Sequence, residues 1–220
     1  MQRGYFEIKN VPNINPESIL NDVATTQNNI EMDGVTQTLG TSPDSIKIIK
    51  NFVDKEELEL LKKLCDFNYK NIQFNQIKET NLIITKYKEK IKNTAENIFG
   101  FKLEHDDLAN EINLKTNYLN GRKPNFATDV HTDTLTDIQN NIKYAWSGHI
   151  SNLLYLNDNY SGGELYFPHH KIKIKPEPGM LVSFPGNWFN RHGILPASDF
   201  RYAINIFLKI SNFPNQPLYI

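Results

Sequence analysis

The chain lacks most features that would mark a secreted, membrane-spanning or nucleic-acid-binding protein. It has a single cysteine, Cys65, which excludes an internal disulfide and fits a reducing compartment. No apolar run approaches membrane-spanning length, and the N-terminus lacks the charged-then-apolar pattern of a secretory signal. With 24 basic and 25 acidic residues the net charge is -1, so no broad electrostatic footprint for nucleic acid is visible. We therefore expect a cytoplasmic protein with neither a membrane nor a nucleic-acid partner.

The length and composition favour one folded domain. A chain of 220 residues with 39% hydrophobic and 11% aromatic residues can bury a substantial core, but it is too short for two domains of typical size with a linker. Residues 1–43 form a polar segment rich in Asn, Thr and Gly. We predict a single domain over residues 1–220, in which 1–43 is an N-terminal extension and 44–212 is the core.

Two helices are predicted in the first half of this core. Asp54 can cap a helix over residues 55–66, with Glu57 three positions later as in a capping box. A second helix is predicted from about residue 77 or 80 to residue 99, and Gly100 would end it. Apolar positions along the first of these helices suggest one buried stripe that braces a sheet.

Most of the remaining core has the pattern of short strands. Brief apolar runs separated by turn residues occupy residues 46–52, 145–156, 164–167, 171–175, 180–184 and 202–208. Short strands at regular spacing are typical of a sandwich or barrel, so the predicted fold class is mainly β with supporting α-helices. Residues 120–129 and 135–144 look loop-like and would be natural lids over a substrate.

His131-Thr132-Asp133, followed far downstream by His192, is the main candidate for chemistry. Non-haem Fe(II) that must bind both a co-substrate and O2 needs protein ligands on one face only, and two histidines with one carboxylate supply this arrangement. On an extended segment, His131 and Asp133 point to the same side. The triplet alone is weak, because surface or core histidines are common. The ordered strands between Asp133 and His192 strengthen it.

A cationic residue follows this set. Arg201 lies nine positions after His192 and precedes the apolar run 202–208, where a charge entering a core must be paired. An arginine is a forked, permanently charged donor suited to a carboxylate. Tyr155 could add a neutral hydrogen bond, although it could equally be a core aromatic residue with its hydroxyl at the rim.

Several ordered motifs give the chain a family resemblance. They are Tyr118-x-x-Gly121, His131-x-Asp133, LLYLND (153–158), YSGGELYFP (160–168), PEPGMLVSFP (176–185), RHGILPA (191–197) and FRYAINIF (200–207). The series resembles the 2-oxoglutarate and Fe(II)-dependent dioxygenase superfamily, and within it the prolyl 4-hydroxylase-like branch. The resemblance implies a double-stranded β-helix, that is, a cupin-like jelly roll, with supporting helices placed mainly before the strands.

The same resemblance implies roles for individual residues. His131, Asp133 and His192 would be the iron ligands, and Arg201 would bind the distal carboxylate of 2-oxoglutarate. Tyr155 matches a tyrosine that helps to hold that carboxylate. Tyr118 matches, more loosely, a tyrosine that lines the co-substrate pocket. The implied cofactors are Fe(II), 2-oxoglutarate and O2, and ascorbate is a further candidate.

The implied reaction is hydroxylation of an unactivated C–H bond. Related halogenases replace the carboxylate ligand with a small residue, so the retained Asp133 favours hydroxylation. A prolyl residue of a peptide or protein is the favoured substrate. The same chemistry on a free amino acid or small metabolite stays open, and so does a non-catalytic metal-binding jelly-roll sensor module. Nucleic-acid demethylases rank lower, because their usual second arginine corresponds to Phe207. The oligomeric state is left open.

Overall fold

The computed structural model describes residues 43–70, 77–106, 119–133 and 149–211, and it describes side chains in the second long helix from Leu82 onward. Two helices precede most of the strands in this part of the chain. The elements are η2 (Pro43–Ser45), β1 (Lys47–Ile49), α3 (Lys55–Lys70), α4 (Ile77–Phe99), β2 (Leu103–His105), β3 (Leu119–Arg122), β4 (Thr128–His131), β5 (Ile150–Tyr155), β6 (Leu165–Phe167), β7 (Ile172–Ile174), β8 (Leu181–Pro185), η3 (Trp188–Asn190), β9 (His192–Ile194) and β10 (Arg201–Ile210).

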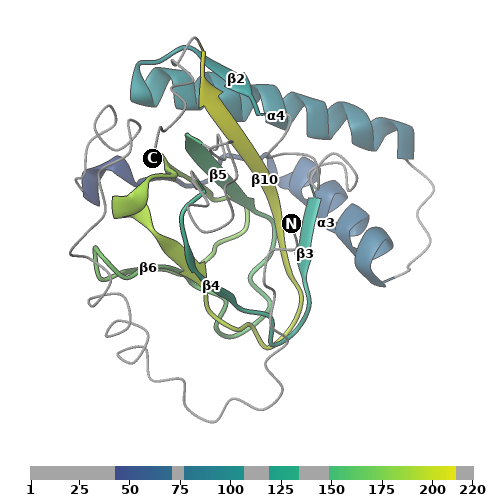
Figure 1. Ribbon diagram of the computed structural model, residues 1–220. Coiled ribbons are helices and arrows are strands. Elements are labelled where there is room, and N and C mark those ends of the chain that lie inside the picture. The colour runs from purple at the N-terminus through teal and green to yellow at the C-terminus, as the bar shows by residue number, and fades with distance from the viewer. Residues whose placement is uncertain (1–42, 71–76, 107–118, 134–148, 212–220) are drawn as a thin grey trace, which may run out of the picture.

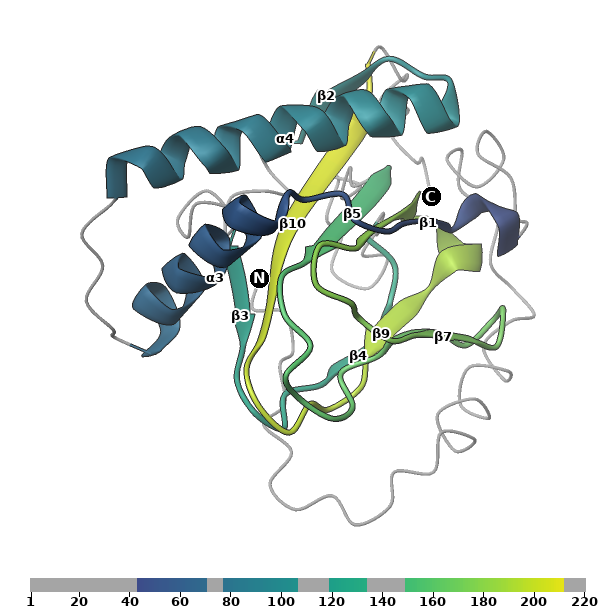
Figure 2. The same cartoon turned by 180° about the vertical axis from the view of Figure 1, so that it is seen from behind.

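The strands form two antiparallel sheets. The larger has six strands in the order β1-β8-β5-β10-β2, with β3 also paired to β10, and the smaller has four in the order β4-β9-β6-β7. Both helices lie against one face of the larger sheet, as the two opposite views show (Figures 1 and 2). The predicted mainly β fold with helices placed early in the chain is therefore confirmed.

Alternation along the central strand β10 creates two cores. Tyr202, Ile204 and Ile206 point to the helix side, where they pack with residues such as Leu61 and Ile91. Residues of the other parity point toward the smaller sheet. A second core lies there, between the sheets, formed by Leu153, Tyr155, Leu165, Phe167, Ile174, Met180, Val182, Phe184, Ile194 and Ala203. The space between the sheets is thus lined by the same face of β10 that begins with Arg201.

The helices end and begin partly as predicted. Gly100 has φ +74° and its N–H donates to the Glu96 carbonyl at 2.9 Å, so the second helix ends where the sequence predicts. The predicted capping box of Asp54 and Glu57, in contrast, does not form. The Asp54 N–H donates to the Tyr87 hydroxyl at 3.2 Å, because Glu57 is engaged by Tyr87 and Lys86 of the neighbouring helix.

The loop prediction for residues 120–129 is also wrong in part. Leu119–Arg122 is β3, which pairs with β10 in the register Arg201↔Arg122, and Thr128–His131 is β4, which pairs with β9. Both strands have polar sequences, and backbone pairing to an apolar neighbour is sufficient to order them. Residues 135–144 lie outside the described residues. The division at residue 43 stays a prediction.

Within the described ranges, the structure contains no helix that is both long and apolar enough to cross a membrane.

Candidate active site

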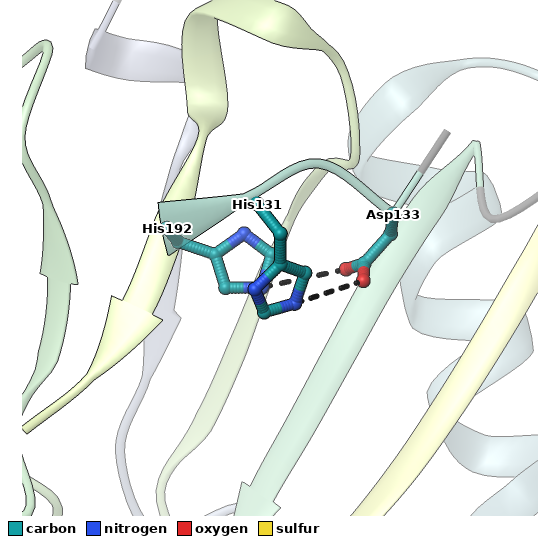
Figure 3. A group of neighbouring side chains, drawn as sticks. All are labelled: His131, Asp133 and His192. Atoms are coloured by element: carbon teal, nitrogen blue, oxygen red, sulfur yellow. Dashed lines mark ion pairs between the residues drawn. The ribbon is translucent and has the colours of Figure 1, made fainter. Parts of the chain in front are cut away.

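Three side chains from the smaller sheet meet at one point. His131 is the last residue of β4 and His192 the first residue of β9, and the two are direct cross-strand partners. Asp133 follows β4 by two residues. One potential ligand atom from each of the three lies within 4.8 Å of the others, and the side chains converge (Figure 3). In the described part of the chain, this is the only such group of three or more His, Cys, Asp or Glu residues.

The distances suit a shared cation. Asp133 Oδ1 lies 3.6 Å from His131 Nε2, and Asp133 Oδ2 lies 3.5 Å from His192 Nε2. Each ring is oriented from its other nitrogen: His131 Nδ1 lies 2.7 Å from the Asp129 carbonyl oxygen, and His192 Nδ1 lies 3.2 Å from that of Asn190. A carbonyl can only accept, so Nδ1 carries the proton and Nε2 presents its lone pair to the centre.

Asp133 is held by groups other than the histidines. The Ser151 hydroxyl donates to Asp133 Oδ2 at 2.5 Å, and the Asp133 N–H donates to the Gly186 carbonyl at 3.1 Å. Burial by itself would raise the pKa of Asp133, but His192, His131 and Ser151 outweigh it and hold that pKa below its usual range. The group is therefore a carboxylate, the form that can bind a metal.

The three side chains of the group differ in exposure. The side chains of Asp133 and His192 are 4% and 5% exposed, whereas that of His131 is 31% exposed. Two imidazole nitrogens and one carboxylate match the donor set of non-haem Fe(II) sites. The chemistry of these residues fits a ferrous ion.

A second polar group lies between the sheets. Arg201 is 1% exposed, and its Nε and Nη1 atoms have no hydrogen-bond partner among the described residues. Tyr155 is completely buried, its hydroxyl likewise has no partner in these ranges, and Arg201 Cζ lies 5.3 Å from the centre of its ring. Burial raises the pKa of Tyr155 although Arg201 opposes the shift, so the phenol stays protonated and can donate.

Unpaired buried donors of this kind are rare and costly. They are adjacent because Tyr155 pairs with Ala203, two residues beyond Arg201 on β10. A guanidinium with a phenol beside it is an incomplete anion site, which a carboxylate would complete. The structure therefore brings together two residues that the sequence singled out separately.

Other residues are placed less simply. Tyr118 lies outside the described residues. Ser151 was not predicted as a functional residue, although it lies on the same face of β5 as Tyr155 and the alternation of the strand would have indicated it. Tyr160, the first residue of the motif 160–168, lies in the loop after β5 and was not singled out from the sequence.

Comparison with known proteins finds a family match over part of the chain. Residues 116–209 match the family model described as the 2OG-Fe(II) oxygenase superfamily, and a search of curated proteins finds no match. A match to that superfamily implies Fe(II), 2-oxoglutarate and O2.

Solved structures with a similar fold include prolyl hydroxylases. The viral collagen prolyl hydroxylase of Paramecium bursaria Chlorella virus-1, in its 2OG complex, is 17% identical with a TM-score of 0.53, covering 76% of this chain and 97% of its own. A Pseudomonas putida prolyl-4-hydroxylase is 15% identical with a TM-score of 0.51, covering 89% and 99%. A Trichoplax adhaerens prolyl hydroxylase, solved with a hypoxia inducible factor peptide fragment, is 15% identical with a TM-score of 0.55, covering 88% and 91%. The double-stranded β-helix is thus confirmed, and the fold is prolyl 4-hydroxylase-like.

Proposed function

We propose that this chain is a 2-oxoglutarate- and Fe(II)-dependent dioxygenase that hydroxylates an unactivated C–H bond, with a prolyl residue of a peptide or protein as substrate. One observation carries the proposal: the fold holds a group of three potential metal ligands and, on the inward face of β10, a buried arginine with two nitrogens that have no partner among the described residues. A metal-binding module without turnover has no use for the second feature.

The geometry of β5 supports a single bound diacid. Ser151, which holds Asp133, and Tyr155, which lies beside Arg201, face the same side of this strand four residues apart. That separation is about 13 Å along an extended strand. We propose that a five-carbon diacid bridges the two groups across the space between the sheets. One end of 2-oxoglutarate would then lie at His131, Asp133 and His192, and the other at Arg201.

Each residue has a defined part. The two histidines and Asp133 would hold iron, which supplies the coupling of O2 activation to oxidative decarboxylation of 2-oxoglutarate. Arg201 and Tyr155 would fix the distal carboxylate and so orient the keto acid end. The partly exposed His131 marks the side from which substrate reaches the centre. Phe184 and Phe167, whose rings lie 4.7 and 5.8 Å from that of His192, exclude water from behind the site.

Similar solved structures support a peptide substrate. The three named above are prolyl hydroxylases, and the one from Trichoplax adhaerens was solved with a peptide fragment. The retained Asp133 favours hydroxylation, because a small residue at this ligand position would open the site to halide.

Mass spectrometry of proline-containing peptides tests the proposal. The full chain is incubated with Fe(II), 2-oxoglutarate, ascorbate and air, and peptides are screened for a gain of one oxygen while succinate is measured. Oxygen gain that depends on 2-oxoglutarate and is absent with His192→Ala is the expected result. Succinate without a modified peptide would instead indicate a small-molecule substrate. Iron binding without any succinate would indicate a non-catalytic sensor.

A further inference from the structure

Tyr160, in the loop after β5, carries a further buried polar atom. Its hydroxyl oxygen is buried and has no hydrogen-bond partner among the described residues, as is the case for the Tyr155 hydroxyl and two nitrogens of Arg201. The ring is only partly buried, so the polar end of this side chain points inward while its edge reaches the surface. This is the reverse of the usual arrangement, in which a tyrosine buries its ring and exposes its hydroxyl.

The loop that carries Tyr160 is firmly positioned. The Ser161 N–H donates to the Ser198 Oγ and the Ser198 N–H to the Ser161 carbonyl, both at 2.9 Å. Gly163 has φ +73°, and a Cβ built on it would lie 2.8 Å from Tyr160 Cε2, so the ring packs directly on this glycine. The loop is thereby attached to the segment that leads into Arg201, and the inward direction of Tyr160 is fixed.

Several charged and polar groups affect the pKa of Tyr160. Burial raises the pKa of Tyr160, the charge of Arg201 opposes the rise, and Tyr155, Asp158 and Glu164 add to it. Arg201 and Tyr155 are thus within electrostatic range of Tyr160. Tyr160 stays a neutral phenol that can donate one hydrogen bond.

One ligand carboxylate can use several of these donors. A carboxylate accepts about four hydrogen bonds, two on each oxygen. Arg201 presents unpartnered nitrogens, and Tyr155 presents a hydroxyl without a partner among the described residues. We infer that Tyr160 supplies a further donor, so that Arg201, Tyr155 and Tyr160 together enclose the distal carboxylate of the co-substrate. The inference rests on the proposed function and makes Tyr160 a determinant of selectivity for a dicarboxylic 2-oxo acid.

Calorimetry of the Mn(II)-loaded full chain tests the inference without turnover. Tyr160→Phe removes the hydroxyl and keeps the ring on Gly163. Its Kd for 2-oxoglutarate should rise about tenfold or more, as for a lost hydrogen bond to a charged group. The Kd for 2-oxobutyrate, which keeps the keto acid end and lacks the distal carboxylate, should change less than about twofold. Tyr166→Phe is the matched control, since its hydroxyl is not among the buried unpartnered atoms, and it should leave both Kd values unchanged.

The outcomes distinguish the role of Tyr160 from the proposed function of the chain. An unchanged Kd for 2-oxoglutarate in Tyr160→Phe would overturn the role of Tyr160, and so would equal weakening of both acids, which indicates a structural effect. A wild-type chain that does not bind 2-oxoglutarate would overturn the proposed function itself.

Discussion

His131 and His192 are direct partners across the β4–β9 pair, with ring centroids 4.6 Å apart. Side chains opposite each other on one face of an antiparallel pair have Cβ atoms about 4.5–5.5 Å apart. The separation of the two imidazoles is therefore set by backbone pairing. Asp133 joins them two residues after β4, where its N–H donates to the Gly186 carbonyl. The triad follows from strand pairing, so one ligand can be removed without removing the scaffold.

Replacement of His192 by alanine should abolish iron-dependent succinate formation. Loss of a ligand exceeds the 10- to 100-fold effect typical of groups that support ligands, so activity should fall by more than about 100-fold. The variant should stay folded, as judged by circular dichroism. His169→Ala is the control, because His169 lies in an exposed turn. Succinate formation by His192→Ala at the wild-type rate would remove His192 from the metal site.

Replacement of Arg201 by methionine should separate ligand binding from stability. An unpaired buried charge destabilises the free protein, so the variant without 2-oxoglutarate should gain at least about 1 kcal/mol in free energy of unfolding. Its Kd for 2-oxoglutarate should rise more than about 30-fold. Chemical denaturation and calorimetry measure the two effects.

Lys209→Met provides the comparison on the same strand, since this side chain is 40% exposed and pairs with Glu104. The Lys209→Met substitution should change neither the free energy of unfolding nor the Kd for 2-oxoglutarate by much. If Arg201→Met bound 2-oxoglutarate as tightly as the wild type does, the distal carboxylate would need another anchor.

Sequence patterns predicted the parts of this fold that depend on local alternation. The strands now seen as β5 to β8 and β10 were predicted because apolar runs and turn residues alternate there, and α4 because its periodicity ends at Gly100. The convergence of His131 and His192 could be expected only from the order of the motifs. No local property of either residue indicates its partner.

The parts that sequence could not predict depend on tertiary context. β3 and β4 are polar strands ordered by pairing with β10 and β9. Glu57 failed to form a capping box because Tyr87 and Lys86, from another helix, compete for its carboxylate. Tyr160 turns its hydroxyl inward only because Gly163 admits its ring. Each case requires knowledge of a neighbour distant in sequence.

Replacement of Ser151 by alanine should weaken metal binding. The lost hydrogen bond to Asp133 Oδ2 frees the carboxylate to rotate, and such supporting contacts are worth about 10- to 100-fold in metal affinity. Ser183→Ala is a matched control, because Ser183 donates to Asn152 at 2.7 Å on the opposite, helix-facing side of the same sheet. Both variants should lose stability, but only Ser151→Ala should lose affinity for Mn(II) in a titration. Equal metal affinity in the two variants would mean that Asp133 needs no support from Ser151.

Replacement of Gly163 by alanine should cost more stability than replacement of Gly100. Both glycines have positive φ, +73° and +74°, so both variants carry the backbone penalty of about 1 kcal/mol. Only at Gly163 would the new Cβ meet a ring, Tyr160, at 2.8 Å, whereas nothing lies within 4 Å at Gly100. The free energy of unfolding of Gly163→Ala should be lower by a further 1–3 kcal/mol or so. The variant should also bind 2-oxoglutarate more weakly, because Tyr160 is displaced. Similar losses in stability for both variants would show that the loop adjusts without cost.

Replacement of Glu57 by glutamine should remove part of the acid sensitivity of folding. Hydrogen bonds from Lys86 and then Tyr87 lower the pKa of Glu57, although burial opposes them. A depressed pKa in the folded state adds stability above the unfolded-state pKa, and this contribution is lost as the pH falls through the folded-state value. Near pH 7 the variant should therefore be less stable than the wild type, by no more than about 1 kcal/mol for so accessible a group. As the pH falls through the acid range the two free energies should converge, because protonated glutamate and glutamine are nearly isosteric. Urea unfolding at a series of pH values measures the difference in free energy of unfolding between the wild type and Glu57→Gln. If this difference stayed constant down to low pH, the ionised form of Glu57 would contribute nothing to stability.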